Sequence, residues 1–497
     1  MLVVGGGITG AGVALDAASR GLRTALVEGH DFGAGTSSRS SKLVHGGLRY
    51  LSQGDYGLVA QALAERQRLL ANAPHLVRPL PFLIPAYGSR AKMRAISAAL
   101  WTYDLIGGFR IGSLHRRLSI SDTLGRSPAL RPAGLVGGHL YLDAHADDAR
   151  LTLAVLRTAV LDYRAVAANY APVRELRPGA GAVIDAGGHD IEVRASVVVN
   201  ATGVWGDALA GDGASAATIR PAKGVHVTVP ASLVPTSVAL VLPVPADGRS
   251  IFVVPWPGTD RVYIGTTDTD YDGPLESPAC TAEDTAYLLD AVNATLTTTL
   301  TAGDVVGSWA GLRPLVAGAG SERSADLSRR HRVTRGAGGV VTIAGGKLTT
   351  YRAMAADTVD EVQAALGRRR SPSRTARLAL RGAAGAGALD EADHLAGRYG
   401  SEARVVRAMI AAEPALAEPL VPALPYQRAE AVYAARYEMA HTLDDVLARR
   451  TRSLILARDA SVEAAAGVAQ LVAPELGWSD AEVDAQVASY RAGAEAG

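Results

Sequence analysis

The chain of 497 residues has almost no cysteine: Cys280 stands alone, and no Cys-x-x-Cys pair occurs. An intrachain disulfide is therefore excluded, and so are zinc ribbons and dithiol redox sites. The histidines show no His-Glu-x-x-His or comparable spacing, so we predict no metal site. This cysteine usage is typical of proteins in a reducing cytoplasm.

An excess of charge and long apolar runs are also missing. The chain carries 50 Lys and Arg against 49 Asp and Glu, a formal net charge of +1. Nucleic-acid binding needs a basic surface that neutralises several phosphates, so we expect no nucleic-acid partner. No uninterrupted apolar run is long enough to cross a bilayer, and the opening MLVVGGG lacks the charged and apolar regions of a secretory leader. We expect a chain that is soluble or peripheral to a membrane.

What is present begins with one β-α-β unit. Residues 2–4 form a short apolar run, and residues 8–20 place apolar side chains on one face of a helix. A second apolar run at 24–27 ends in Glu28. This order is the first unit of a dinucleotide-binding fold.

Later parts of the chain show other patterns. Residues 58–73 and 91–106 have helical spacing, whereas short β-rich runs between about 180 and 275 predict a second, sheet-containing domain. A strand, a glycine turn and a helix return at 338–354. After the basic segment at 368–374, Ala, Glu and Arg at helical spacing predict a separate helical C-terminal domain.

Gly5, Gly7 and Gly10 form a Gly-x-Gly-x-x-Gly motif between the first strand and helix. Gly5 permits a tight turn, Gly7 lets the backbone approach a pyrophosphate, and Gly10 lets the helix pack closely on the strand. Glu28 is placed to accept hydrogen bonds from ribose hydroxyls. The motif predicts a dinucleotide site without separating NAD from FAD.

Two later glycine turns favour FAD. Residues 201–203, Ala-Thr-Gly, follow one expected strand, and Gly345 and Gly346 follow another. An extended dinucleotide with a tricyclic ring needs close backbone approach at several such points. The helix that begins after Gly346 can also direct its N-terminus at the flavin, where negative charge gathers on reduction.

Seven strings, taken together and in order, identify a family. They are GGGITGAG at 5–12, TSSRSSKLVHGGLRYL at 36–51, NATGVW at 200–205, KGVHV at 223–227, IGTTD at 264–268, GLRP at 311–314 and GGKLTTYR at 345–352. The chain resembles the FAD-dependent glycerol-3-phosphate dehydrogenases, the respiratory enzymes of glycerol catabolism, over nearly its whole length. The strings at 36–51 and 345–352 are far more specific than a glycine fingerprint.

The resemblance implies the fold and its domains. We expect an α/β FAD-binding Rossmann-like fold of the glutathione-reductase/D-amino-acid-oxidase type, with a β-sheet substrate domain and an α-helical C-terminal domain. The FAD-binding domain would take residues 1–366 discontinuously, with the substrate domain interleaved from about 75–135 and 205–335. The helical domain would take residues 375–497.

The resemblance also implies the reaction and the partners. sn-Glycerol 3-phosphate would be oxidised to dihydroxyacetone phosphate, and electrons would pass through noncovalent FAD to a respiratory quinone. The chain would then be cytoplasmic and peripherally associated with the inner face of the cytoplasmic membrane, with a homodimer among its possible assemblies.

A substrate phosphate requires cations, and arginine suits it because its planar fork binds phosphate bidentately and stays charged. By resemblance, Arg49 and Arg329 are assigned to the phosphate and Arg313 to the reacting oxygen. The division among them stays open, and Arg330 or Arg332 can serve in place of Arg329.

Removing a hydride from a secondary alcohol also requires a base for the hydroxyl proton. His45 is the first candidate, since its ordinary pKa lies near neutral pH and the Gly-Gly pair after it leaves room for a substrate. His226 is a second candidate and, with Tyr50, is assigned to substrate binding. Lys347 is expected to polarise the substrate oxygen or to lie at the flavin edge.

Hydroxyl groups in the two specific strings suit a cofactor. We expect the FAD pyrophosphate and ribityl chain to meet Ser37, Ser38 and Lys42. The complete expected cofactor set is Gly5, Gly7, Gly10, Glu28, Ser37, Ser38, Lys42, Ala201, Thr202, Gly203, Gly345, Gly346, Lys347, Leu348, Thr349 and Thr350.

Residues 89–117 interleave six Lys and Arg side chains with apolar ones, against the single acid Asp104. Such a segment can lie on an anionic bilayer, or it can bury Trp101 in the core and leave its arginines in solvent. The resemblance to quinone-linked enzymes favours the membrane.

Three other functions stay open from the sequence. The same half-reaction can reduce dioxygen to hydrogen peroxide, and an amine or amino-acid oxidase can use the same fold. The arginine set argues against the latter, because an amino acid offers a single carboxylate. A flavin-binding, membrane-associated scaffold without turnover is the third.

Overall fold

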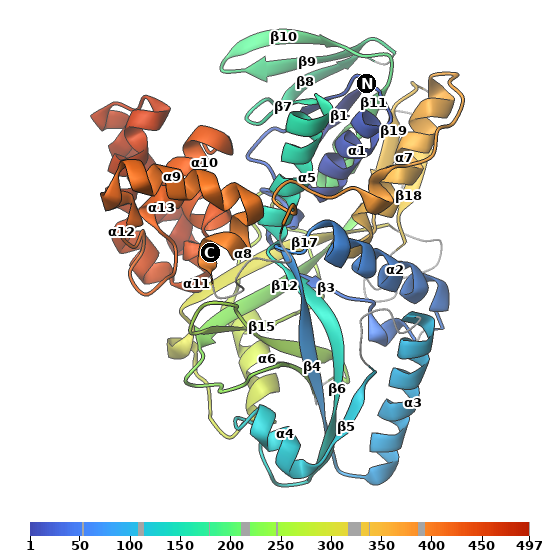
Figure 1. The fold of residues 1–497 in the computed structure, drawn as a ribbon, viewed down its shortest axis with the longest axis vertical. Helices are drawn as coiled ribbons and strands as arrows, with labels where there is room; N and C mark the ends of the chain where they lie inside the picture. The colour runs from blue at the N-terminus through green and yellow to red at the C-terminus, as the bar shows by residue number, and fades with distance from the viewer. Residues whose placement is uncertain are drawn as a thin grey trace.

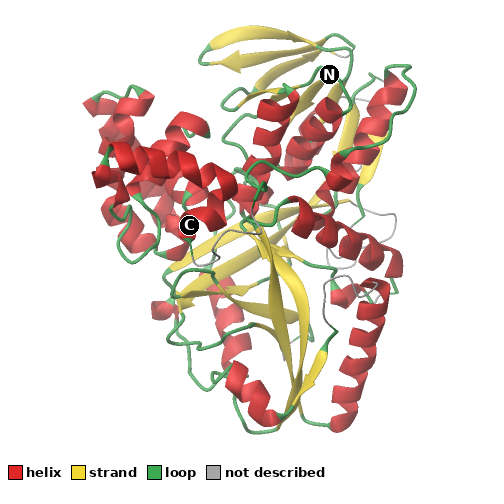
Figure 2. Cartoon of the chain, in the orientation of Figure 1, coloured by secondary structure: helices red, strands yellow, loops and turns green. Residues whose placement is uncertain are grey.

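A computed structural model describes residues 1–51, 54–107, 114–177, 179–209, 219–244, 247–316, 330–336, 338–385 and 393–496. Figure 1 shows two sheet-based parts that share a long boundary, with a lobe of helices beside them. Figure 2 shows that this lobe, formed by the end of the chain, contains helices and loops.

The first part is built on a six-stranded sheet in the order β18-β19-β11-β1-β2-β7. The strands are β1 (Leu2–Val4), β2 (Ala25–Val27), β7 (Val166–Ala168), β11 (Val198–Asn200), β18 (Arg332–Arg335) and β19 (Val341–Ala344). All pairs are parallel except that of β18 with β19. Short parallel strands buried on both faces need layers above and below them.

Helices form one of these layers and a small sheet forms the other (Figure 1). The helices are α1 (Ile8–Ser19), α5 (Asp148–Tyr163) and α7 (Tyr351–Ala365), and the small antiparallel sheet joins β8 (Val173–Arg177), β9 (Gly181–Ala186) and β10 (His189–Arg194). Val3 packs toward the helices, whereas Leu2 and Val4 pack toward the small sheet. Because successive side chains of β1 point to opposite faces, this strand packs against both the helices and the small sheet.

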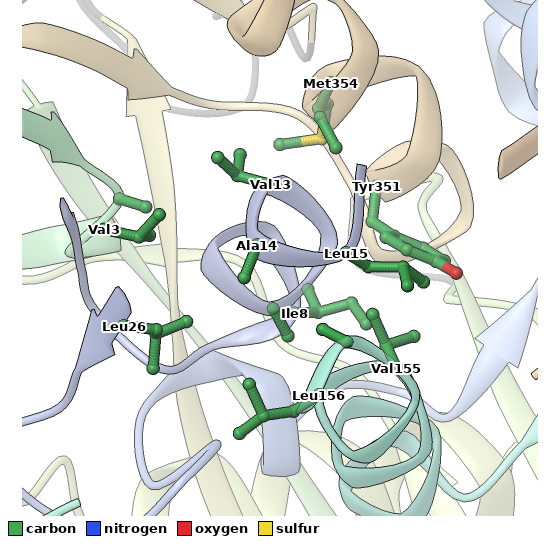
Figure 3. Close-up of a cluster of buried hydrophobic side chains, with 14 of the residues drawn as sticks. Val3, Ile8, Val13, Ala14, Leu15, Leu26, Val155, Leu156, Tyr351 and Met354 are labelled. Carbon is green, nitrogen blue, oxygen red and sulfur yellow. The ribbon is translucent and has the colours of Figure 1, made fainter. Parts of the chain in front are cut away.

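Helix α1 lies between α5 and α7 in the core (Figure 3). Its Val13 and Leu15 are buried among Val155, Tyr351 and neighbouring side chains. A Cβ added to Gly10 would lie 1.9 Å from the Gly5 carbonyl oxygen, so only glycine lets the helix approach the turn this closely. This is the packing role predicted for Gly10.

The second part is built on a ten-stranded sheet in the order β16-β12-β15-β14-β13-β4-β6-β3, with β17 paired to β12 and β5 to β6. The bounds are β3 (Leu43–Val44), β4 (Val77–Tyr87), β5 (Arg116–Leu118), β6 (Leu135–Ala146), β12 (Ile219–Pro230), β13 (Ala239–Pro243), β14 (Ser250–Pro255), β15 (Arg261–Gly265), β16 (Thr269–Asp270) and β17 (Gly307–Val316). Strands β3 and most of β6 lie outside the ranges 75–135 and 205–335 expected for the substrate domain. The β-rich stretch at 180–275 divides among all three sheets, because it also contains β11 of the six-stranded one.

Four helices accompany the ten-stranded sheet: α2 (Tyr56–Asn72), α3 (Arg90–Gly107), α4 (Ile120–Arg126) and α6 (Ala282–Asn293). Helices α2 and α3 confirm the helices predicted at 58–73 and 91–106. In the part of the chain that the structure describes, none of the helices has the length and apolarity needed to traverse a bilayer.

The chain ends in the predicted helical domain. Its helices are α8 (His394–Tyr399), α9 (Ala403–Ala412), α10 (Arg428–Tyr437), α11 (Ser453–Leu456), α12 (Arg458–Leu476) and α13 (Asp480–Ala496). Before α11, the segment Arg449–Arg452 turns back toward the six-stranded part, where Arg450 pairs with Asp31 at 2.6 Å. Charged contacts therefore join this domain to the loop after β2.

Candidate active site

A cavity of about 1200 Å³ is lined from both sheet-based parts. One wall contains the glycine turn after β1, the ends of β2, β11 and β19, and residues 34–37 and 39–41. The other wall comes from β12, β14, β17 and their loops. Strands of an α/β sheet commonly bind ligands beyond their carboxyl ends, and this cavity lies there.

The glycine turn is shaped for close approach of a ligand. Gly5 has φ +107°, and a Cβ there would lie 2.6 Å from the Ala201 carbonyl oxygen. A Cβ on Gly7 would lie 3.0 Å from Ser37 Oγ, which accepts a hydrogen bond from the Ile8 backbone N at 2.8 Å. The N-terminus of α1 thus presents its donors at the cavity wall, as a pyrophosphate requires.

Glu28 braces the same turn. Its Oε2 accepts a hydrogen bond from Gly6 N at 2.6 Å, and its Oε1 accepts one from His30 N at 2.9 Å. The side chain also lines the cavity beside the turn, which is the position expected for a ribose-binding acid.

Most of the expected cofactor set meets at this cavity. Its lining contains Gly5, Gly7, Glu28, Ser37, Ala201, Thr202, Gly203, Gly345, Gly346, Lys347, Leu348 and Thr349. Gly203, Gly345 and Gly346 have φ of +62°, +74° and +84°, a backbone that favours glycine. The set fits FAD. Three glycine turns, each after a separate strand, leave space along the cavity wall that larger side chains would fill.

Gly10, which has the packing role already described, does not belong to the described lining, and neither do Lys42, Ser38 and Thr350. Lys42 is 3% exposed and its Nζ lies 3.2 Å from Asp148 Oδ1, which is a structural ion pair and not a phosphate contact. Burial lowers the pKa of Lys42 to about 8. The Thr350 hydroxyl donates to the Lys347 carbonyl at 3.3 Å. These three positions therefore support the wall from behind.

Arg313 on β17 lies in the opposite wall. Its Nη1 donates to Asp268 Oδ1 at 2.9 Å, and its Nη2 donates to Thr266 Oγ1 and to the Thr267 carbonyl, both at 3.1 Å. A Cβ on Gly224 would lie 2.4 Å from Nη2, so this glycine of β12 makes room for the guanidinium. The cation is held in one orientation at the cavity.

His226 lies beside it, 2% exposed and stacked on Trp309 with ring centroids 4.7 Å apart. Its Nε2 is 2.9 Å from Ser41 Oγ, and among the described residues its buried Nδ1 has no hydrogen-bond partner. Burial, with the charges of Lys42 and Arg313, lowers the pKa of His226 well below its usual range. The ring is therefore neutral at physiological pH.

The string HGGLRY and the string GGKLTT meet between the two walls. The His45 backbone N donates to Thr349 Oγ1 at 3.3 Å, and Lys347 Nζ lies 3.7 Å from the centre of the Tyr50 ring. His45, Tyr50 and Lys347 all line the cavity. The sequence pattern predicted this meeting only through the family resemblance.

The Gly-Gly pair after His45 also has a packing role that was not expected. A Cβ on Gly47 would lie 2.4 Å from the Tyr50 ring, and one on Gly46 would lie 2.4 Å from Tyr103 Oη. The pair makes room for the protein's own aromatic side chains. Gly47 also lines the cavity beside His45.

Among the described side chains, none of the other four candidate arginines lines the cavity. Only the backbone of Arg49 is described, and Arg329 lies outside the described residues. Arg330 is exposed and pairs with Asp55 at 2.7 Å, and Arg332 is exposed on β18. Neither Arg330 nor Arg332 belongs to the cavity lining as far as the structure describes it.

Sequence reasoning missed further cations of the lining, among them Arg39 and Arg249. Burial and the charge of Arg449 lower the pKa of the Arg39 guanidinium. Arg249 donates through Nη1 to the Asp268 carbonyl at 3.0 Å. The run of serines around Arg39 was visible, but no local pattern showed that Arg249 reaches the loop that holds Arg313.

Comparisons with known proteins agree with this geometry. A model of the FAD dependent oxidoreductase family matches residues 1–352, and a model of the C-terminal domain of alpha-glycerophosphate oxidase matches residues 342–483. Glycerol-3-phosphate dehydrogenase 2 of Mycobacterium bovis is 44% identical over 520 residues, which span 100% of this chain and 88% of the relative. The chain belongs to the FAD-dependent glycerol-3-phosphate dehydrogenase family.

Other members of the glycerol-3-phosphate dehydrogenase family match over almost the whole chain. The human mitochondrial glycerol-3-phosphate dehydrogenase is 37% identical over 531 residues, 99% of this chain and 72% of the relative. The crystal structure of the glycerol-3-phosphate dehydrogenase from Bacillus halodurans, complexed with FAD, has a TM-score of 0.80 and 33% identity, covering 99% of this chain and 94% of that one. The predicted family, fold class and FAD cofactor are confirmed.

Proposed function

We propose that the chain oxidises sn-glycerol 3-phosphate to dihydroxyacetone phosphate and passes the two electrons to a respiratory quinone. One observation carries this proposal: a single cavity joins a dinucleotide-binding turn to a wall that holds Arg313 and a neutral His226. A dinucleotide and a small anionic alcohol can therefore lie side by side in it.

FAD would be held at the first wall. The N-terminus of α1 with Gly5, Gly7 and Ser37 would meet the pyrophosphate, Glu28 the adenosine ribose, and the turns at 201–203 and 345–349 the remainder. When bound, FAD supplies the acceptor for a hydride.

By family likeness, Arg49 and Arg329 would bind the substrate phosphate as cations, and Tyr50 would donate a hydrogen bond to it. Arg313, fixed by Asp268 and Thr266, would direct its guanidinium at the oxygen on C2. A preorganised donor at this oxygen stabilises the charge that develops as the O–H bond breaks. Lys347 would add a second positive charge near the same point.

The oxidation removes a hydride from C2 and a proton from its hydroxyl, leaving a carbonyl. His45 would accept the proton, because it is the histidine of the lining whose ring reaches the cavity beside Lys347 and Tyr50. His226, kept neutral by burial, lines the same cavity as Arg313 and would help to orient the substrate.

Helix α3 supports the proposed membrane contact and, through it, a quinone as electron acceptor. Lys92 and Ile96 of α3 line the cavity, while Trp101 and Leu105 farther along are 53% and 68% exposed. Trp101 is held at the surface by edge contact with His115, with ring centroids 5.0 Å apart. The exposed aromatic and aliphatic side chains favour contact with a bilayer, from which a quinone can approach.

The decisive experiment mixes purified, FAD-containing protein with glycerol 3-phosphate in the absence of oxygen. Oxidised-flavin absorbance should disappear, and sarcosine in the same concentration should leave it unchanged. Bleaching by sarcosine and not by glycerol 3-phosphate would establish an amine oxidase and refute the substrate.

A second measurement separates the acceptors. After reduction, a soluble quinone analogue should restore the oxidised spectrum much faster than dissolved oxygen, with little hydrogen peroxide formed. Fast reoxidation by oxygen with stoichiometric peroxide would identify an oxidase.

A further inference from the structure

A buried cluster of opposite charges ties the C-terminal domain to the segment Thr36–Lys42. It joins Arg452, just before α11, to Asp147, Asp148 and Lys42. The side chains of Arg452, Asp148 and Lys42 are 1%, 0% and 3% exposed. Water therefore screens these charges very little.

The cluster holds the backbone of this segment directly. The Ser38 carbonyl accepts hydrogen bonds from Arg452 Nη1 and from Lys42 Nζ, each at 3.1 Å. Asp148 Oδ2 accepts from Ser40 N at 2.9 Å and from Ser40 Oγ at 2.7 Å. Arg452 and Asp148, which come from distant parts of the chain, thus hold Ser38 and Ser40 of one short loop.

The other side of the same segment faces the cavity. Ser37, Ser40 and Ser41 belong to the lining, whereas Ser38 and Lys42 do not. Ser37 Oγ lies at the N-terminus of α1, and Ser41 Oγ lies 2.9 Å from His226 Nε2. Moving the Ser38 carbonyl would therefore shift hydroxyls at both the cofactor end and the substrate end.

Stability by itself does not account for this arrangement. Arg452 and Lys42 have φ of +60° and +56°, a left-handed backbone that residues with side chains rarely adopt unless their surroundings hold it. A buried ion pair also gains little net stability, because desolvation offsets the attraction. What the cluster does provide is a fixed geometry.

We propose that Arg452 is a positioning residue for the oxidation, through which the C-terminal domain sets the cavity-facing serines of segment 36–42. The inference rests on the proposed function, because its consequence is measured in that reaction. The C-terminal domain is then part of the catalytic apparatus, although Arg452 itself does not line the cavity within the described structure.

The test compares Arg452→Lys with Arg398→Lys in the full-length holoenzyme. Lysine keeps the charge at 452 but loses the fork that reaches Ser38 and Asp147 together. Arg398 is the matched control, since its side chain is only 11% exposed and also reaches Asp147, at 3.5 Å. Its other hydrogen bonds go to Glu430 and the Arg450 carbonyl.

We expect Arg452→Lys to lower kcat with a dye acceptor by about 10-fold to 100-fold, as small misplacements near reacting groups do. The visible circular dichroism of the bound flavin should change as well. Arg398→Lys should lose as much thermal stability as Arg452→Lys, but its kcat and flavin dichroism should stay close to wild type. Guanidinium ions added to Arg452→Ala should recover part of the lost kcat.

Equal kcat and flavin dichroism in Arg452→Lys and wild type would overturn the inference, and so would equal losses in the two lysine variants. If Arg452→Lys does not fold, Asp148→Asn takes its place with the same expected losses, and failure of both to fold would show a folding element and overturn the inference. A wild-type protein that glycerol 3-phosphate does not reduce would refute the proposed function instead.

Discussion

At the scale of single residues, Arg313 has its side chain fixed by neighbouring groups. Asp268, Thr266 and Thr267 hold its guanidinium from behind, so that the group is oriented before a substrate arrives. Such preorganisation is how a donor lowers a barrier without having to move during the reaction.

We predict that Arg313→Ala lowers kcat/KM for glycerol 3-phosphate by about 100-fold to 1000-fold, the usual effect of losing one donor to a developing oxyanion. FAD should stay bound, because the residues expected to hold it lie in the opposite wall. Steady-state kinetics and the flavin-to-protein absorbance ratio measure the two effects. Near-normal turnover would refute the role given to Arg313.

A substitution at Gly224 tests the position of Arg313 without removing any functional group. In Gly224→Ala the new methyl group would lie 2.4 Å from Arg313 Nη2, so the guanidinium must move. We expect kcat/KM to fall by about 10-fold to 100-fold with the fold retained. Gly125→Ala is the matched control, because a Cβ there meets nothing within 4 Å. Equal kinetics of the two variants would show that Arg313 tolerates displacement.

At the scale of elements, helix α3 joins the cavity to the surface. The sequence left open whether Trp101 lies in the core or on a membrane, and the structure shows the side chain 53% exposed. Leu105, one turn later, is 68% exposed. An exposed apolar pair on a basic helix is a feature that a monomer in water does not need.

We predict that Trp101→Gln with Leu105→Gln lowers partitioning onto anionic phospholipid vesicles by about 10-fold or more, since burying such side chains contributes about 1.5–3 kcal/mol each. Co-sedimentation with vesicles measures this, and activity with a soluble dye acceptor should not change. Leu161→Gln is the control, because Leu161 is 53% exposed on α5. If all variants sediment alike, α3 is not the membrane-binding element.

At the scale of the whole molecule, buried histidines couple stability to pH. Burial, with the charges of Arg150 and Arg78, lowers the pKa of His75 to about 4. Burial and Arg78 lower the pKa of His145 to about 4 as well. Both rings are neutral in the folded protein and take up a proton near the usual pKa of about 6.5 once unfolded.

The lowered pKa values of His75 and His145 make the folded protein less stable in acid. Because the folded-state pKa lies below the unfolded value, the contribution is present above about pH 6.5 and is lost as the pH falls toward 4. We predict a free energy of unfolding that declines over this window, measured by urea unfolding. His75→Gln should decline less steeply, whereas His189→Gln, at an exposed position on β10, should decline like wild type. An unchanged slope in His75→Gln would contradict the assignment.

Local sequence predicted the first wall of the site well. The glycine turn, Glu28 and the later turns at 201–203 and 345–346 depend on backbone sterics within a few residues, and the structure places them all at one cavity. Lys42 could not be predicted in this way. Its ion-pair partner Asp148 lies 106 positions away, and burial of both decides where the ammonium points.

In the opposite wall, too, the sequence predicted some of the lining residues and missed others. Arg313 and His226 were found through family strings, but Arg249 was not, because only the neighbouring placement of β14 and the loop after β15 brings it to Asp268. The packing role of Gly46 and Gly47 was also not predicted. The aromatic rings that fill their space come from the turn that follows and from α3.

The sequence by itself determined the dinucleotide turn, the family and the chemical groups available for the reaction, because these depend on short-range backbone freedom and on side-chain type. Only the tertiary structure decided which side of segment 36–42 faces the ligands and which side is held by Arg452 and Asp148. Charge pairing in a buried, weakly screened environment joins residues that the sequence keeps hundreds of positions apart, and no local pattern encodes that partnership.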